Sequence, residues 1–140
     1  MGTLLKLVVV LIISLTNLEV KTEETYSLEV KVEELDSNKG QMFISIYNTE
    51  TEFLGKSYKG TKSKITNNSC VVTFEDLPKG TYAVSIFHDE NNNGKLDSNF
   101  MGIPKEDYGC SNNARGFMGP PKWKDAKFQL KENKSITITL

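Results

Sequence analysis

The sequence predicts an all-β fold: an antiparallel β-sandwich with Greek-key connections, six to seven strands and one long ordered loop excursion. Two observations support this prediction. Apolar and polar residues alternate through most of the chain after residue 26, and clusters of turn-forming residues separate the alternating runs. No window sustains the 3.6-residue period of an amphipathic helix. The 140 residues fit one domain of ordinary size, which we place at residues 19–140.

The alternation also predicts which face of each strand enters the core. Successive side chains of a strand point to opposite faces, so apolar residues of one parity should be buried together. The expected core residues are Leu28, Val30 and Val32; Met42, Ile44 and Ile46; Cys70, Val72 and Phe74; Tyr82, Val84 and Ile86; Ala126, Phe128 and Leu130; and Ile136, Ile138 and Leu140. The segments LDSNKG, EDLPKG and KENK supply turns between strands.

The first residues, MGTLLKLVVVLIISLT, differ from the rest of the chain. Lys6 precedes an apolar run at residues 7–13, which is shorter than the roughly 20 residues of a membrane span. A short apolar run after a basic residue is typical of a secretory signal peptide. We therefore expect residues 1–18 to be a signal peptide and the mature protein to be periplasmic or extracellular, without a membrane span. The alternative is a buried N-terminal strand.

Charge and cysteine content limit the function classes. The 17 basic and 18 acidic residues leave a net charge of -1, which argues against nucleic-acid binding because phosphate neutralisation needs a clustered basic excess. Export would permit a disulfide between Cys70 and Cys110. The core-facing parity of Cys70 fits a buried free thiol equally well, so both alternatives stay open.

Residues 89–121 interrupt the alternation with many Gly, Asn and Pro residues. The segment also contains Phe100, Ile103 and Tyr108, which a disordered linker would tend to lack. Long irregular segments in compact domains are often functional. We therefore expect an ordered excursion that packs on one end of the sandwich.

This part of the chain resembles a known family. The pattern consists of the Leu-Pro-x-Gly turn in DLPKG, a strand ending in His-Asp, then Asn-x-Asn-Gly-x-Leu-Asp, Gly-x-Pro, Ser-Asn-Asn, Gly-Pro-Pro and Ala-x-Phe. In these motifs the chain resembles the bacterial secreted family called domain of unknown function 2141, from about residue 26 to the end. Cys110 departs from the pattern, which usually has Phe there. The resemblance implies an exported sandwich similar to transthyretin-like or carboxypeptidase-regulatory-like domains, and it implies no catalytic residues.

The segment DENNNGKLD has the spacing of a calcium-binding loop. Alternate oxygen-bearing side chains at loop positions 1, 3, 5 and 9 converge on one centre, and a glycine at position 6 permits the sharp bend. The residues expected to bind calcium are Asp89, Asn91, Asn93, Lys95 (through its backbone carbonyl) and Asp97.

The same segment has an ion-free interpretation. Asn93-Gly94 is a strong turn dipeptide, and Asn and Asp side chains can cap their own backbones. Phe100 stands where the twelfth loop position usually has a bidentate glutamate, so a complete cage would need Glu106 or Asp107. Calcium binding and an ion-free turn both remain open, and affinity for calcium would lie at about 10⁻⁴ to 10⁻³ M.

Two further hypotheses concern function. A small secreted hydrolase would centre on His88 with Asp89 or Asp97 and Ser111. No nucleophile or metal-hydrolase motif is present, so we expect a non-enzymatic structural or binding module.

Arg115, Phe117 and Met118 are the candidate binding surface for a glycan or peptide. The alternative is that their loop only clamps the sandwich end.

Overall fold

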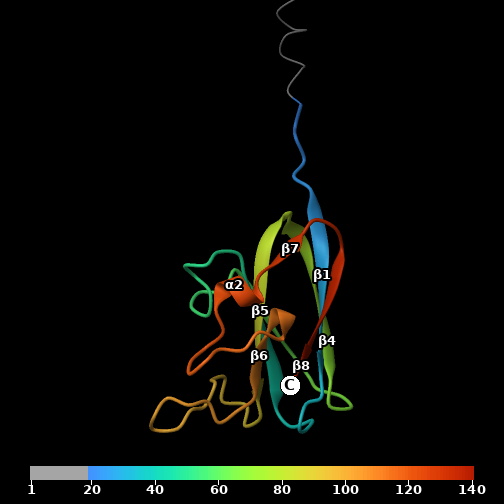
Figure 1. Ribbon diagram of the computed structural model, residues 1–140. Helices are drawn as coiled ribbons and strands as arrows, with labels where there is room; N and C mark the ends of the chain where they lie inside the picture. Colours follow the sequence, from blue (N-terminus) through green and yellow to red (C-terminus); the bar gives the residue numbers. More distant parts are fainter. Residues whose placement is uncertain (1–18) are drawn as a thin grey trace, which may run out of the picture.

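Two β-sheets enclose the core in the computed structural model, which describes residues 19–140 (Figure 1). The first sheet has the order β4-β1-β8, with β1 at Thr25–Glu33, β4 at Cys70–Pro78 and β8 at Lys134–Thr139. The second has the order β3-β2-β5-β6, and β7 pairs with β5. Its strands are β2 (Gln41–Tyr47), β3 (Lys59–Ser63), β5 (Gly80–Asp89), β6 (Tyr108–Cys110) and β7 (Phe128–Leu130). The expected signal peptide, residues 1–18, lies outside the described residues.

The predicted all-β sandwich class is confirmed, with two differences in detail. Residues 19–140 form eight strands instead of six to seven, because β3 and β6 were not expected as strands. The sequence of β3, KGTKS, has no apolar alternation, since this strand lies at a sheet edge and buries little of its surface. The pairing of β1 with β8 is parallel, whereas the other strand pairs are antiparallel.

The core between the sheets follows the predicted parity. Leu28, Val30 and Val32 of β1 have no exposed surface, and the alternate residues of β2 and β5 are buried against them. Four predicted core residues are only partly buried: Val72, Phe128, Ile136 and Leu140. Ala126 differs in another way, because it ends a short helix, α2 (Trp123–Ala126), and does not belong to a strand. It is buried with Ala83 in a second, smaller cluster.

This smaller cluster lies where α2 and the one-turn helix η1 (Ser111–Asn113) contact β5. The Ser111 hydroxyl is fully buried, accepts a hydrogen bond from the Val84 amide at 3.0 Å and donates one to the Ala126 carbonyl. The Asn112 side chain donates to the carbonyls of Asp125 and Lys127. These bonds attach the end of the long excursion to the sheet.

The excursion is partly where we expected it. Its first part, up to β6, lies at one end of the sandwich, at the bottom of Figure 1. Residues 97–105 form a projecting hairpin, which we call the tongue, closed by a hydrogen bond from the Lys105 amide to the Asp97 carbonyl at 2.7 Å. Asn99 shapes its tip by accepting bonds from the amides of Met101 and Ile103. The second part instead runs back along β5 through β6, η1 and α2.

Both cysteine thiols are buried and free, so the structure has free thiols and not the disulfide between Cys70 and Cys110. Cys70 belongs to β4 and Cys110 to β6, in different sheets. Burial raises the pKa of both thiols, and that of Cys110 to about 11. Among residues 19–140, no helix has the length and hydropathy that crossing a bilayer requires.

Candidate functional site

The predicted calcium loop, residues 89–97, follows directly from β5 at the lower end of the sandwich. Asp89 ends the strand and is fully buried. Its Oδ1 accepts a hydrogen bond from the Asn93 amide at 3.2 Å, and its Oδ2 accepts from the Gly94 amide at 2.9 Å and from Gln41 Nε2 at 3.2 Å. The Asp89 carboxylate therefore organises the turn around itself, and Gly94 takes the positive φ of +77° that the bend requires.

Three further side chains of the loop converge. Asn91 Oδ1 accepts from the Asn93 amide at 3.2 Å, and Asn93 Oδ1 accepts from the Lys95 amide at 2.9 Å. The side-chain amides of Asn91 and Asn93 then donate to the two carboxylate oxygens of Asp97, each at 2.7 Å. The bonds from Asn93 and Asn91 lower the pKa of Asp97, so its carboxylate stays ionised in mildly acidic solution.

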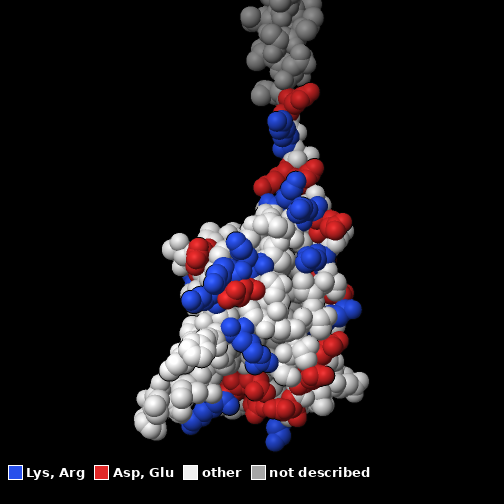
Figure 2. Space-filling model, viewed as in Figure 1, with Lys and Arg blue, Asp and Glu red and all other residues white. Residues whose placement is uncertain are grey.

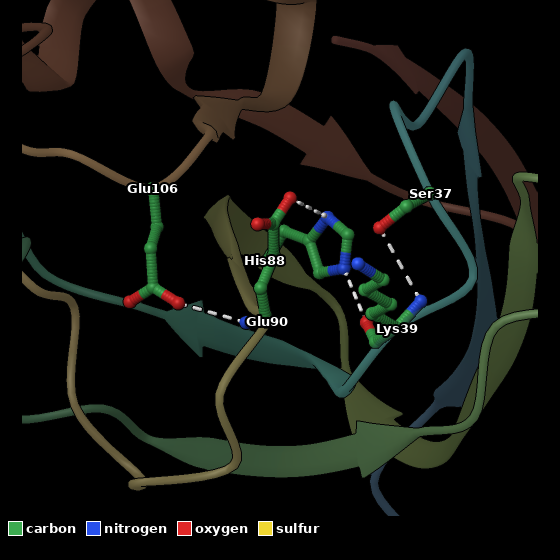
Figure 3. Close-up of polar contacts among 5 residues, drawn as sticks. All are labelled: Ser37, Lys39, His88, Glu90 and Glu106. Carbon is green, nitrogen blue, oxygen red and sulfur yellow. Dashed lines mark hydrogen bonds and ion pairs between the residues drawn. The ribbon is translucent and has the colours of Figure 1, made fainter.

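Glu106, the residue that directly follows the tongue, contacts the loop through its side chain. Its Oε1 accepts a hydrogen bond from the Asp97 amide at 2.9 Å, and its Oε2 accepts from the Glu90 amide at 2.7 Å, the contact drawn in Figure 3. The sequence left open whether Glu106 or Asp107 would complete the loop. No local sequence signal singles out Glu106, because the folding of the tongue brings it back to Asp97.

Asp107 has a different environment. Its carbonyl oxygen accepts a hydrogen bond from the His88 amide at 2.8 Å, and its carboxyl group lies beside that of Asp36. Burial, followed by the hydrogen bond and charge of Asp36, raises the pKa of Asp107. Because its carboxyl group lies beside Asp36 and not at Asp97, Asp107 is not part of the candidate site.

The candidate site carries net negative charge, although the charge of nearby Lys105 contributes to the lowered pKa of Asp97. Within residues 19–140, no Lys or Arg forms an ion pair with the carboxylates of Asp89, Asp97 or Glu106. Figure 2 shows acidic side chains gathered at this end of the molecule. A carboxylate offers about four lone-pair positions, so the hydrogen bonds described leave acceptor capacity free. No three His, Cys, Asp or Glu side chains of the described residues form a ready metal-binding group. A bound cation would therefore also need amide and backbone carbonyl oxygens.

The only histidine, His88, lies beneath the loop and is fully buried. Its Nε2 is 2.6 Å from the Lys39 carbonyl, and since a carbonyl oxygen only accepts, Nε2 carries the proton (Figure 3). Its Nδ1 lies 3.6 Å from Glu90 Oε1 and has no hydrogen-bond partner. Ser111, the serine of the hydrolase hypothesis, is also fully buried. Neither side chain has surface at which a substrate could meet it.

The three predicted binding-surface residues have different surroundings. Arg115 lines a small hollow of about 310 Å³, with Asn113 and Thr139. Met118 lines a larger groove of about 870 Å³. Phe117 is 93% exposed. Near them, Asn113 Oδ1 accepts a hydrogen bond from the Thr139 amide at 3.0 Å. This bond favours the alternative in which the loop only clamps the sandwich end.

The chain was compared with known proteins. A family model described as "Uncharacterized protein conserved in bacteria (DUF2141)" matches residues 30–139, which include the loop, the tongue and most of both sheets. No curated protein and no solved structure matches the chain.

Proposed function

The chain belongs to the DUF2141 family of bacterial proteins, and we propose that it is an exported, non-enzymatic binding module that binds calcium through residues 89–97 and Glu106. The observation that carries this proposal is that the Asp89, Asp97 and Glu106 carboxylates each accept hydrogen bonds from residues 89–97, while none of them forms an ion pair with a Lys or Arg of the described residues. Calcium prefers six to eight oxygen ligands, including carboxylates and carbonyls.

The direction of the two asparagine side chains suggests how the loop responds to the ion. The nitrogen atoms of Asn91 and Asn93 donate to the Asp97 carboxylate. A cation at this point would take over the role of those donors, while the Oδ1 atoms and the Lys95 carbonyl supply further ligands. Binding therefore requires small side-chain rearrangements within a backbone turn that already exists.

Melting curves in millimolar calcium and in chelator test the proposal. With a dissociation constant near 10⁻⁴ M, a few millimolar calcium should stabilise the fold by about 2 kcal/mol and raise the melting temperature by several degrees. Asp97→Asn should remove most of this gain. We choose Asp97 because Asp89 is buried and accepts three structural hydrogen bonds, so its substitution would perturb the ion-free fold. Asp125→Asn, an exposed change on α2, is the matched control. Identical wild-type curves in calcium and chelator would contradict calcium binding and support the interpretation of the loop as a turn without an ion.

The non-enzymatic part of the proposal is supported by the burial of His88 and Ser111 and by the hydrogen bonds of Ser111 to the backbone. A nucleophilic serine needs access to substrate and a base within hydrogen-bond reach. A fluorophosphonate probe, which labels activated serines, should leave the folded protein unmodified. Labelling at Ser111 that disappears in His88→Gln would instead support the hydrolase.

A further inference from the structure

A groove of about 870 Å³ lies on the second sheet, on the face opposite the main core. Ser45 and Tyr47 of β2 and Ser85 and Phe87 of β5 form part of its floor. These residues alternate with the core residues of the same strands, so their side chains point away from the other sheet. The floor therefore belongs to the outer face of this sheet, which α2 and η1 cover near Ala83.

The walls of the groove come from two separate segments. Met101 and Ile103 of the tongue form one wall, and Met118 and Pro120 form the other. Apolar side chains near this site are unusually exposed: Met101 is 69%, Ile103 55% and Met118 93% exposed. In Figure 2 the flank of the tongue, at the lower left, shows few charged side chains. Exposed apolar patches of this kind typically mark binding sites.

The lining determines the charge of the occupant. No Lys, Arg, Asp, Glu or His side chain is among the residues that line the groove. A charged ligand would lose hydration there and gain no opposite charge, which is strongly unfavourable. The occupant that fits is therefore neutral.

The floor also offers one specific polar contact. Tyr47 Oη and Ser85 Oγ lie 3.2 Å apart and share one hydrogen bond. This bond uses one of the two hydroxyl protons, so the other proton remains free to donate. A ligand with a single carbonyl or hydroxyl oxygen at this point would satisfy it.

We propose that the groove binds a neutral, mainly hydrocarbon small molecule that carries one carbonyl or hydroxyl group. The volume lies within the roughly 300 to 1,000 Å³ of typical small-molecule sites, which are also concave, mostly apolar and equipped with few polar groups. A glycan fits less well, because its many hydroxyls would need more hydrogen-bond partners than this lining provides. The proposal does not depend on calcium binding.

Titration with N-phenyl-1-naphthylamine, a neutral apolar fluorophore, tests the proposal. The single tryptophan, Trp123, contacts Phe53, which contacts Tyr47 on the floor, so bound probe should quench the Trp123 emission. We expect saturable binding of one probe per chain with micromolar affinity. Ile103→Asp and Met118→Asp each place a charge on one wall and should weaken binding about tenfold or more. Val71→Asp, at a 54% exposed position on the other sheet, is the matched control and should bind normally.

Three outcomes would overturn the proposal. The first is probe binding that does not saturate or that ignores both wall variants. The second is a dimer in sedimentation velocity that both wall variants dissociate, since a second copy would then occupy the groove. The third is co-sedimentation with phosphatidylcholine vesicles that the wall variants abolish, without saturable probe binding, since the exposed apolar side chains would then insert into a bilayer.

Discussion

The Asp97 amide donates a hydrogen bond to Oε1 of Glu106 at 2.9 Å. This bond joins the loop at residues 89–97 to the residue that directly follows the tongue. The neighbouring bond from the Lys105 amide to the Asp97 carbonyl closes the base of the tongue. The tongue in turn provides Met101 and Ile103 to the groove wall. The candidate cation site and the apolar groove are therefore physically connected through Asp97.

This connection predicts coupling between the two proposed ligands. Calcium bound at Asp97 and Glu106 should hold the tongue in place, so that the groove requires less ordering when its ligand binds. We expect millimolar calcium to lower the dissociation constant of N-phenyl-1-naphthylamine by about fivefold, a typical coupling magnitude. The measurement is the same titration in calcium and in chelator, with Asp97→Asn as the variant that should lose the difference. Equal affinities in both buffers, together with a calcium-induced rise in melting temperature, would show that the two sites act independently.

The core of the sandwich predicts a large effect of truncation. Ile86 is 2% exposed and packs between the sheets, so Ile86→Ala should lower the free energy of unfolding by about 2 to 5 kcal/mol. Val71→Ala, at the exposed position on β4, should change it by less than about 0.5 kcal/mol. Urea denaturation of the two variants measures both values. A midpoint unchanged by Ile86→Ala would mean that the two sheets do not pack through this residue.

Two glycines with positive φ predict different costs of adding a methyl group. A Cβ at Gly40 would lie 1.9 Å from the Asp89 carbonyl oxygen, a backbone atom that cannot move aside. A Cβ at Gly94 would meet nothing within 4 Å. Gly94→Ala should therefore cost only the left-handed strain of about 1 kcal/mol, whereas Gly40→Ala should cost about 3 kcal/mol or more. Denaturation midpoints compare the two variants, and similar losses would argue against the close approach of Gly40 to Asp89.

The buried Cys110 thiol predicts a loss of stability at high pH. Burial raises its pKa from the ordinary 9.0 to about 11, so between these pH values the unfolded chain releases a proton that the folded chain keeps. The stabilisation from this group is complete below pH 9.0 and declines as the pH rises toward 11. Unfolding free energies at pH 7, 9 and 10 should therefore fall more steeply for the wild type than for Cys110→Ala. The variant is the necessary comparison because tyrosines and lysines also titrate in this range. Parallel declines would show that the thiol is accessible to water.

Part of this structure was determined by the sequence on its own. The alternation in residues 28–32, 42–46 and 82–86 identified the buried face of three strands, because strand geometry sends alternate side chains to opposite sides wherever the strand lies. The turn at Asn93-Gly94 was likewise local, since the conformational freedom of glycine and the hydrogen bonds of Asp89 and Asn91 act within a few residues.

Only the tertiary structure decided the features that join distant segments. The alternation in β8 does not encode that it pairs with β1 in parallel, and the edge strand β3 has no apolar alternation at all. Glu106 reaches Asp97 because the tongue folds back, and Met118 lines the same groove as Ile103 because the excursion returns along β5. The physical reason is the range of the interactions. Side-chain parity and turn chemistry act over a few residues, whereas a cluster of carboxylates or an apolar groove exists only after packing brings separate parts of the chain together.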